Sequence, residues 1–331
     1  MTGRHEIKFK KFLDEERKTV ERKLNQALKG RKPDSLYEPG YYIIEGGGKR
    51  LRPMLVLLAV KAVGGKLSSA YNAAAAVELL HNFTLVHDDI MDNAEKRRNI
   101  LTVHKKYDMS TAILAGDSLL SVAYEYLLKD CNGTAKKVLS AFTKGLVEVC
   151  EGQSLDKEFE IRKSVSIEEY LEMIEKKTAA MIEMCCTVGA LLGGGDKKET
   201  KNLSDLGKNL GIAFQIQDDL LDIAGNENDF GKLVGGDLVE GKKTFLFLKA
   251  LEVAKGADKK KLLDVIKNKG INPGQIQEYK SLYEKLNITG AAEKEIKHYT
   301  NLALKSVKKI RVEEYSEFFA LLADSLIKRR K

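Results

Sequence analysis

Apolar and alanine-rich stretches, separated by short charged or glycine-rich segments, follow one another along the 331 residues of this chain. No run of useful length alternates apolar and polar residues as a half-buried strand does. The predicted helices cover residues 8–28, 54–63, 68–92, 110–130, 135–160, 166–195, 198–225, 245–256 and 259–270, with two more toward the C-terminus. Residues 32–40 hold two of the four prolines and are predicted to form a connection. We therefore expect one all-α domain over residues 1–331, with residues 1–36 as an N-terminal helical extension.

Charge and cysteine content narrow the classes of function. A formal net charge of +8 suits an anionic ligand or nucleic acid, but the lysine runs lack interleaved aromatic residues and are better explained as solvated surface. The four cysteines form no CxxC pair, so we expect reduced thiols packed as small apolar residues. The N-terminal segment is too charged for a signal peptide, and no apolar run is long enough to span a membrane. We expect a cytoplasmic protein.

Two acidic clusters carry the most specific chemistry. The stretches DDIMD (residues 88–92) and DDLLD (residues 218–222) both follow the pattern DDxxD, 130 residues apart, and each follows an apolar helical stretch. Carboxylates at i and i+4 share a helix face, and in apolar surroundings such a pair requires a cation. Oxygen-only ligands suit Mg²⁺ bridged to substrate phosphates, whereas zinc would call for Cys or His. The alternative is two ordinary acidic helix ends.

Basic residues near these clusters are candidate phosphate ligands. Lys49, Arg50 and Arg52 lie in the segment GGGKRLRP, where glycines let the backbone approach an anion; the spacing is not that of a P-loop. Arg97 and Arg98 follow the first cluster, and His81 precedes it by almost two helical turns on roughly the same face. A glycine-rich loop after the second cluster carries the candidates Lys232, Asp237 and Lys242.

Five ordered motifs resemble the trans-isoprenyl diphosphate synthases from about residue 37 to the C-terminus. They are GGGKRLRP, HNFTLVHDDIMDNAEKRR, EKKTAAM, FQIQDDLLDI and FGKLVGGDLVEGKKT. The resemblance implies a helical bundle of the isoprenoid synthase type around a deep central cavity, and a homodimer. It also implies Mg²⁺-dependent head-to-tail condensation of isopentenyl diphosphate with an allylic diphosphate, without nucleic acid or a membrane span.

The resemblance also assigns residues. It places metal ions on Asp88, Asp89, Asp92, Asp218, Asp219 and Asp222, and these act in catalysis with Lys177, Thr178 and Gln215. It places the allylic diphosphate near Arg97, Lys177, Thr178, Gln215, Lys232 and Lys242, with Gln153 and Asp156 as supporting residues. It places isopentenyl diphosphate, without metal, on Lys49, Arg52, His81 and Arg98.

Product length is expected to depend on residues upstream of Asp88. One helical turn rises about 5.4 Å, close to one isoprene unit, so Thr84, Phe83 and Leu80 mark successive depths of an apolar tunnel. In the family this chain resembles, an aromatic residue five positions before the first aspartate limits elongation. Phe83 occupies that position here, which points to a short product. We expect geranylgeranyl diphosphate (C20) first, with farnesyl diphosphate (C15) or a mixture as the alternative.

Two other readings use the same motifs. A class I terpene cyclase also carries an aspartate-rich helix, but its second metal motif is typically of an Asn/Ser/Glu type, whereas this chain repeats DDxxD. A non-catalytic subunit of a prenyl synthase would tend to lose the aspartates, and both clusters are complete here. The sequence therefore favours the synthase.

Overall fold

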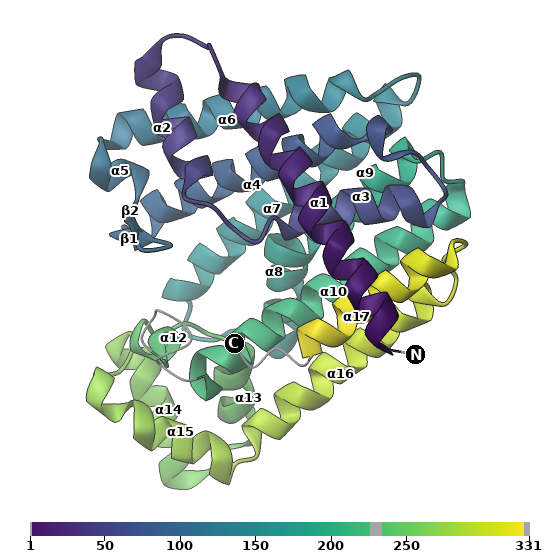
Figure 1. Cartoon of the computed structure of the whole chain (residues 1–331). Coiled ribbons are helices and arrows are strands. Elements are labelled where there is room, and N and C mark those ends of the chain that lie inside the picture. The colour runs from purple at the N-terminus through teal and green to yellow at the C-terminus, as the bar shows by residue number, and fades with distance from the viewer. Residues whose placement is uncertain (1, 226–233, 328–331) are drawn as a thin grey trace. The chain divides into compact units, whose positions relative to one another are not determined.

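The computed structural model describes residues 2–225 and 234–327. Within these ranges nearly all regular structure is helical, and the exception is a two-stranded antiparallel hairpin of β1 (Lys96–Arg97) and β2 (Ile100–Leu101). The predicted all-α class is confirmed (Figure 1). Lys232, one of the predicted diphosphate ligands, lies outside the described residues. The expected deep central cavity stays a prediction.

Contacts group the chain into two compact units. Unit 1 comprises residues 1–142, 185–203 and 309–318, and unit 2 comprises residues 143–184, 204–308 and 319–331. Helices α7 (Ala135–Ile161), α9 (Ala180–Leu192), α10 (Lys197–Ala224) and α17 (Glu313–Ile327) contribute residues to both. The expectation of a single domain stays a prediction.

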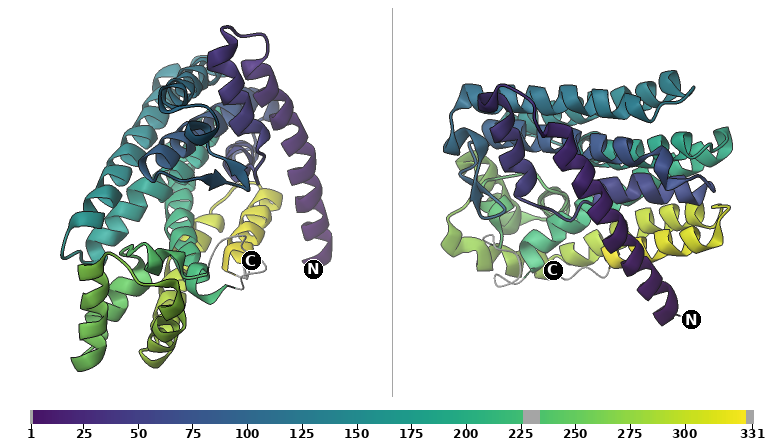
Figure 2. Two further views of the ribbon diagram at one scale, coloured as in Figure 1. Left: turned by 90° about the vertical axis from the view of Figure 1, so that its left-hand side faces the viewer. Right: turned by 45° about the horizontal axis from the view of Figure 1, so that its top comes forward.

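Unit 1 is built on the pair α4 (Tyr71–Met91) and α6 (Met109–Lys129), which pack along their lengths. Its other elements are α1 (Thr2–Leu28), α2 (Asp34–Glu45), α3 (Leu51–Ala62), η1 (Leu67–Ser69) and α5 (Val103–Lys106). Helix α1 crosses α3 and α4 (Figures 1 and 2). Four consecutive alanines of α4, at positions 73–76, are fully buried, and their small side chains permit this close helix packing.

Helix α2 corrects the sequence prediction, which made residues 32–40 a connection. Pro33 precedes the first helical residue, where the fixed φ of proline is tolerated, but Pro39 lies inside the helix and removes one intrahelical hydrogen bond. Burial outweighs that cost. Pro39, Ile43 and Ile44 are buried, and Gly40 lies so close to Leu28 and Leu119 that an added Cβ would meet them at 3.4 and 3.5 Å.

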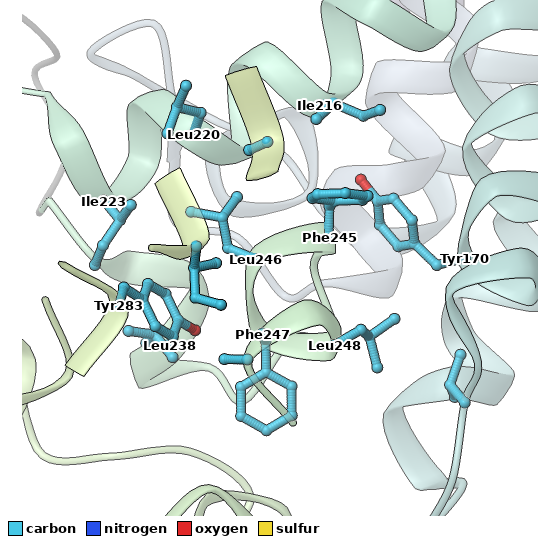
Figure 3. Packing of buried hydrophobic residues seen from close by; sticks show 14 of the residues in the cluster. Tyr170, Ile216, Leu220, Ile223, Leu238, Phe245, Leu246, Phe247, Leu248 and Tyr283 are labelled. Carbon is cyan, nitrogen blue, oxygen red and sulfur yellow. The ribbon is translucent and has the colours of Figure 1, made fainter. Parts of the chain in front are cut away.

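Unit 2 surrounds α13 (Phe245–Val253), which packs against α8 (Ile167–Ile174), α14 (Gly256–Asn268) and α16 (Ile288–Val307). It also contains η2 (Glu175–Ala179), α12 (Gly236–Val239), η3 (Pro273–Gln275) and α15 (Ile276–Lys285). Phe245 and its three successors are all buried, and Figure 3 shows Tyr170, Leu220 and Tyr283 in the same cluster. This core fixes the end of α10, where the second acidic motif lies.

Two further expectations are answered by the described residues. All four cysteines carry free thiols, and Cys131, Cys185 and Cys186 are buried as predicted for small apolar residues. The prediction is wrong for Cys150, which is exposed. In the part of the chain that the structure describes, no helix combines the length and apolar character that crossing a membrane would need.

Candidate active site

The first acidic motif lies at the C-terminal end of α4. Asp88 is half-buried and Asp92, which caps the helix, is exposed, whereas Asp89 is only 1% exposed. Arg97 donates from Nε to both carboxylate oxygens of Asp89, at 2.8 and 2.9 Å, and its Nη2 lies 2.7 Å from Oδ1. A guanidinium therefore neutralises the buried aspartate, while the outer two remain toward the surface.

The hairpin that carries Arg97 folds back onto the same helix end. The Ala94 amide donates to the carbonyl of Asp89 at 2.9 Å, and the buried Thr102 hydroxyl donates to the carbonyl of Ala94 at 2.7 Å. Arg98 and Asn99 form the two-residue turn between β1 and β2, with φ of 52° and 66°. Positive φ at both positions matches a type I′ turn, whose twist suits a tight hairpin. Arg98 is thus held at the tip of the hairpin.

The glycine-rich segment meets the hairpin tip in unit 1. Arg98 donates to the carbonyl of Gly47, and a Cβ added to Gly48 would lie 3.0 Å from the Arg98 guanidinium. Gly48 has φ of 145°, a conformation that side chains rarely adopt. Glycine therefore serves both the backbone conformation and the approach of Arg98.

His81 completes this cationic cluster. Arg52 Nη1 lies 3.1 Å from His81 Nε2, and because a guanidinium only donates, Nε2 must be the unprotonated acceptor. Burial, and then the charges of Arg52 and Arg98 with their arginine neighbours, hold the pKa of His81 well below its usual range. The structure thus gathers Arg52, His81 and Arg98 in unit 1, with the exposed Lys49 on the same segment.

The second acidic motif lies near the end of α10 in unit 2. Asp219 is 7% exposed, whereas Asp218 and Asp222 are half-buried. Asp219 accepts hydrogen bonds from the Tyr170 hydroxyl at 2.5 Å, from Gln215 Nε2 at 3.1 Å and from the Phe245 amide at 3.0 Å. Its pKa is raised to about 7 by burial and then by nearby Asp237, although the three hydrogen bonds act in the opposite direction.

A pocket in unit 2 collects most of the remaining predicted residues. Its lining includes Asp156, Lys177, Thr178, Gln215, Asp219, Asp237 and Lys242. Lys177 Nζ pairs with Asp156 at 2.5 Å, and the Thr178 hydroxyl donates to Gln215 Oε1 at 2.8 Å. The segment after the second motif is joined to it, because the Asp237 amide donates to Asp222 Oδ2 at 3.2 Å. Cationic and neutral polar groups therefore share one cavity wall with Asp219.

Lys177 and Thr178 project from a π-helical turn, η2, which interrupts the helical run of α8 and α9. A Cβ added to Gly152 of α7 would lie 2.2 Å from the Lys177 amide nitrogen, and one added to Gly211 of α10 would lie 2.4 Å from the Ala179 Cα. Two glycines therefore admit the widened turn between their helices. Such turns are often found at functional sites.

Gln153 stands out among the buried polar residues. Its side chain is 8% exposed, and neither amide atom makes a hydrogen bond to any of the described residues. A buried amide without partners costs free energy, and such groups are commonly completed by water or ligand. The predicted supporting role of Gln153 fits this state.

The residues predicted to set product length lie in unit 1. Leu80 is fully buried and Phe83 is 9% exposed, while the hydroxyl of Thr84 donates to the carbonyl of His81 at 2.8 Å. The Phe83 ring packs against His87 with centroids 4.6 Å apart. A Cβ added to Gly116 of α6 would lie 2.4 Å from His87 Nε2, so glycine at 116 makes room for this ring pair.

The carboxylates of the two DDxxD motifs can be compared with the ligands that Mg²⁺ prefers. Among the described residues, no group of three or more His, Cys, Asp or Glu side chains is arranged as a protein-only metal site. Mg²⁺ keeps several waters and is usually held by one or two carboxylates together with substrate phosphates. Asp88 with Asp92, and Asp218 with Asp222, supply such pairs, so the residues fit the ion.

Sequence reasoning missed several features that shape these clusters. Arg50 is buried and donates hydrogen bonds to Glu21 and Glu78. Tyr170 and the glycines at 116, 152 and 211 were also missed. The glycines left a signal, because an isolated glycine inside a helical pattern usually has a packing reason. Arg50 was seen only as one of three basic residues. Tyr170 sits in an ordinary amphipathic stretch and left no signal.

The chain is similar to proteins of one family. The profile of the family described as polyprenyl synthetase matches residues 33–286. The geranylgeranyl diphosphate synthase of Sulfolobus acidocaldarius is 40% identical over 302 residues, which cover 89% of this chain and 91% of that protein. The geranylfarnesyl diphosphate synthase of Natronomonas pharaonis is 41% identical over 257 residues, covering 72% and 75% of the two chains.

A solved structure extends the likeness to the fold. The crystal structure of geranylgeranyl pyrophosphate synthetase from Pyrococcus horikoshii superposes with a TM-score of 0.90 at 36% identity, covering 97% of this chain and 98% of that one. Sequence profile, relatives and fold agree over most of the chain. The chain therefore belongs to the polyprenyl synthetase family of prenyltransferases.

Proposed function

We propose that this protein condenses isopentenyl diphosphate with allylic diphosphates head to tail and releases mainly geranylgeranyl diphosphate. The observation that carries the proposal is shared by the two DDxxD motifs: the middle aspartate is bound by protein groups, while the outer two remain less buried. Carboxylates that are less buried in this way are suited to binding Mg²⁺ together with a diphosphate.

The outer aspartates Asp88, Asp92, Asp218 and Asp222 would hold Mg²⁺, which supplies charge that stabilises a departing diphosphate. The motif also nominated Asp89 and Asp219 as ligands. Both are more deeply buried than the outer aspartates and accept hydrogen bonds on their two carboxylate oxygens, so we assign them the task of positioning the neighbouring aspartates.

The polar wall of the unit 2 pocket would act on the allylic substrate. Lys177 and Lys242 bind its diphosphate and draw negative charge onto the leaving group. The motif adds Arg97 and Lys232 to this set. The oxygens of Thr178 and Gln215, with the unpartnered amide of Gln153, stabilise the positive charge that develops on the allylic carbon.

The cationic cluster of unit 1 would bind isopentenyl diphosphate without metal. Lys49, Arg52 and Arg98 supply charge, and His81 binds as a neutral imidazole because its pKa is held below its usual range by burial and by the arginines. The double bond of this substrate attacks the allylic carbon, and loss of a proton completes the new C5 unit. The departing diphosphate is a suitable acceptor for that proton.

Product length would be set by the apolar face of α4. Phe83, packed on His87, lies one to two turns before Asp88 and would limit elongation to a short product. The relatives named above are described as geranylgeranyl and geranylfarnesyl diphosphate synthases, so product length differs among similar proteins. Farnesyl diphosphate, or a mixture, stays the alternative to the C20 product, as the sequence suggested.

A homodimer through α6 is part of the proposal. Ile113, Leu114 and Leu128 of this helix are 42%, 57% and 49% exposed, and Met109 at its start is 48% exposed. Large apolar side chains on one helix are suited to burial against a second copy. Light scattering of the purified protein would test this, and a monomeric mass would contradict it. The expected cytoplasmic location stays a prediction.

The reaction is tested by incubating the protein with isopentenyl diphosphate, Mg²⁺ and dimethylallyl, geranyl or farnesyl diphosphate in turn, followed by chromatography of the products. We expect a C20 product that disappears with EDTA and returns with added Mg²⁺. Absence of any prenyl diphosphate product from all three primers would sink the proposal.

The length assignment has its own variant. Phe83→Ala should shift products toward longer chains, because it opens the tunnel below His87. Phe142→Leu, which changes a buried aromatic residue elsewhere in unit 1, should leave the length distribution unchanged. An unaltered distribution in Phe83→Ala would refute the role of Phe83.

A further inference from the structure

Arg50 lies between two predicted diphosphate ligands, yet its side chain points into the protein. The residue is 2% exposed. Its guanidinium donates to Glu21 from Nε at 2.7 Å and from Nη2 at 3.3 Å, to Glu78 from Nη1 at 2.9 Å and to the carbonyl of Ile44 from Nη2 at 2.7 Å. All four bonds are made to groups of unit 1.

These partners come from three different elements. Glu21 belongs to α1, Ile44 to the last turn of α2, and Glu78 to α4. Arg50 itself is the N-cap of α3 and has φ of 50°, in the left-handed region that costs free energy for a residue with a side chain. Its four hydrogen bonds offset that cost and fix the point at which the loop enters α3.

Residues 46–52 contact α4 at two points. Glu78 binds Arg50, and His81, three residues later on the same helix face, contacts Arg52. Residues 46–52 therefore meet α4 in a defined register, with Lys49 just before the anchor and Arg52 just after it.

Stability alone does not account for this ion cluster. Burial lowers the pKa of the Arg50 guanidinium, but Glu21 and Glu78 more than compensate, so the group stays charged inside the protein. Replacing buried ion clusters with apolar residues is often neutral or stabilising, which means that such a cluster is a poor device for stability. It is better suited to holding a backbone segment in one place.

We propose that Glu21 of α1 is a positioning residue for isopentenyl diphosphate, because with Glu78 it holds Arg50 and so places Lys49 and Arg52. The N-terminal helical extension then belongs to the substrate site. This inference rests on the proposed role of Lys49, Arg52, His81 and Arg98.

The chain offers a matched control on the same helix. Glu16 accepts a hydrogen bond from the Tyr71 hydroxyl at 2.7 Å and so joins α1 to the start of α4. A substitution at Glu16 tests only how α1 is attached to α4. A substitution at Glu21 tests that attachment together with the position of residues 46–52. The Glu21 side chain is 37% exposed, so the isosteric Glu21→Gln change is compatible with folding.

The experiment measures kcat and the KM of each substrate for the full chain with Mg²⁺, for Glu21→Gln, Glu21→Asp and Glu16→Gln. We expect Glu21→Gln to raise the KM for isopentenyl diphosphate about tenfold, equivalent to about 1.4 kcal/mol. The KM for the allylic primer and kcat should change less than about twofold on the same scale. Glu21→Asp, which keeps the charge, should recover part of the loss, and Glu16→Gln should match the unaltered protein.

An unchanged KM for isopentenyl diphosphate in Glu21→Gln overturns the inference, as does an equal rise in the KM of both substrates or the same effect in Glu16→Gln. Arg52→Ala separates this failure from failure of the proposed function. If Arg52→Ala raises the KM for isopentenyl diphosphate and Glu21→Gln does not, the substrate site stands and only the role of Glu21 is wrong. If Arg52→Ala has no effect, the assignment of the site itself fails. Should Glu21→Gln not fold, Glu78→Gln provides the same comparison from the other side of Arg50.

Discussion

The two DDxxD motifs share a pattern of burial but differ in how the buried carboxylate is compensated. Asp89 is 1% exposed and paired with a guanidinium, whereas Asp219 is 7% exposed and held by a phenol, an amide side chain and a backbone amide. In the first motif the charge is neutralised; in the second it is only solvated by dipoles.

The difference comes from the residues that neighbouring segments place beside each buried carboxylate. Arg97 is eight residues from Asp89 and reaches it through a hairpin, while Tyr170 is 49 residues from Asp219 and Asp237 adds a like charge. A carboxylate in the second environment has its pKa raised by burial and by Asp237. Two motifs of the same DDxxD pattern can therefore have different electrostatics, since the partners lie outside the motif.

The largest effects are expected at the outer aspartates, where the two motifs should behave alike. Asp88→Ala and Asp218→Ala should each lower kcat by at least about 10²–10³-fold, because each removes charge that stabilises the leaving diphosphate. Steady-state kinetics measure the loss, and circular dichroism should show an intact helical fold. Asp264→Ala, at an exposed position of α14, is the control. Near-normal turnover in either outer variant would contradict the proposed mechanism.

The next prediction concerns one hydrogen-bond donor to the second motif, the hydroxyl of Tyr170. Tyr170→Phe removes the hydroxyl that donates to Asp219 and should lower stability by about 1.5–3 kcal/mol, because the bond is made to a carboxylate. Tyr279→Phe is the control, since its hydroxyl donates to the carbonyl of Lys261 in the same core and its loss should cost about 0.5–1.5 kcal/mol. Thermal melting of both variants ranks the two costs, and a smaller loss in Tyr170→Phe would contradict the expectation.

The smallest effects are expected at the middle aspartates, Asp89 and Asp219, where substitutions in the two motifs should differ in their effect on stability. Asp89→Asn weakens the pairing of Arg97 and should lower the free energy of unfolding by about 1–3 kcal/mol. Asp219→Asn should cost less than about 1 kcal/mol, since its carbonyl still accepts from Tyr170 and Phe245 and the repulsion by Asp237 disappears.

Urea unfolding without ligand measures both changes. The amide group introduced by Asp219→Asn would face Gln215, whose own amide is able to rotate because its partner, the Thr178 hydroxyl, is able to accept instead of donate. Equal losses in the two variants would show that the compensating partners do not matter, and the comparison drawn above would be wrong.

The sequence predicted the helical class and the residues of the candidate site better than it predicted their partners. Apolar patterning located α4, α6 and α10, but Pro39 made α2 look like a connection because burial against Leu28 and Leu119 is not visible in local sequence. Arg97 was nominated as a phosphate ligand, and its pairing with Asp89 needed the turn at Arg98 and Asn99. The contact of Tyr170 with Asp219 depends on how α8 packs, which no spacing rule supplies.

The two glycines beside the π-helical turn have a consequence for protein engineering. At 152 a single methyl group would occupy the space of the Lys177 backbone, and at 211 it would occupy that of Ala179. Mutant libraries aimed at new substrates or products should therefore keep both codons fixed, because most replacements would shift Lys177 and Thr178 before any change in selectivity is felt. Diversity is better placed at Phe83, whose ring packs on the side chain of His87, which is able to repack.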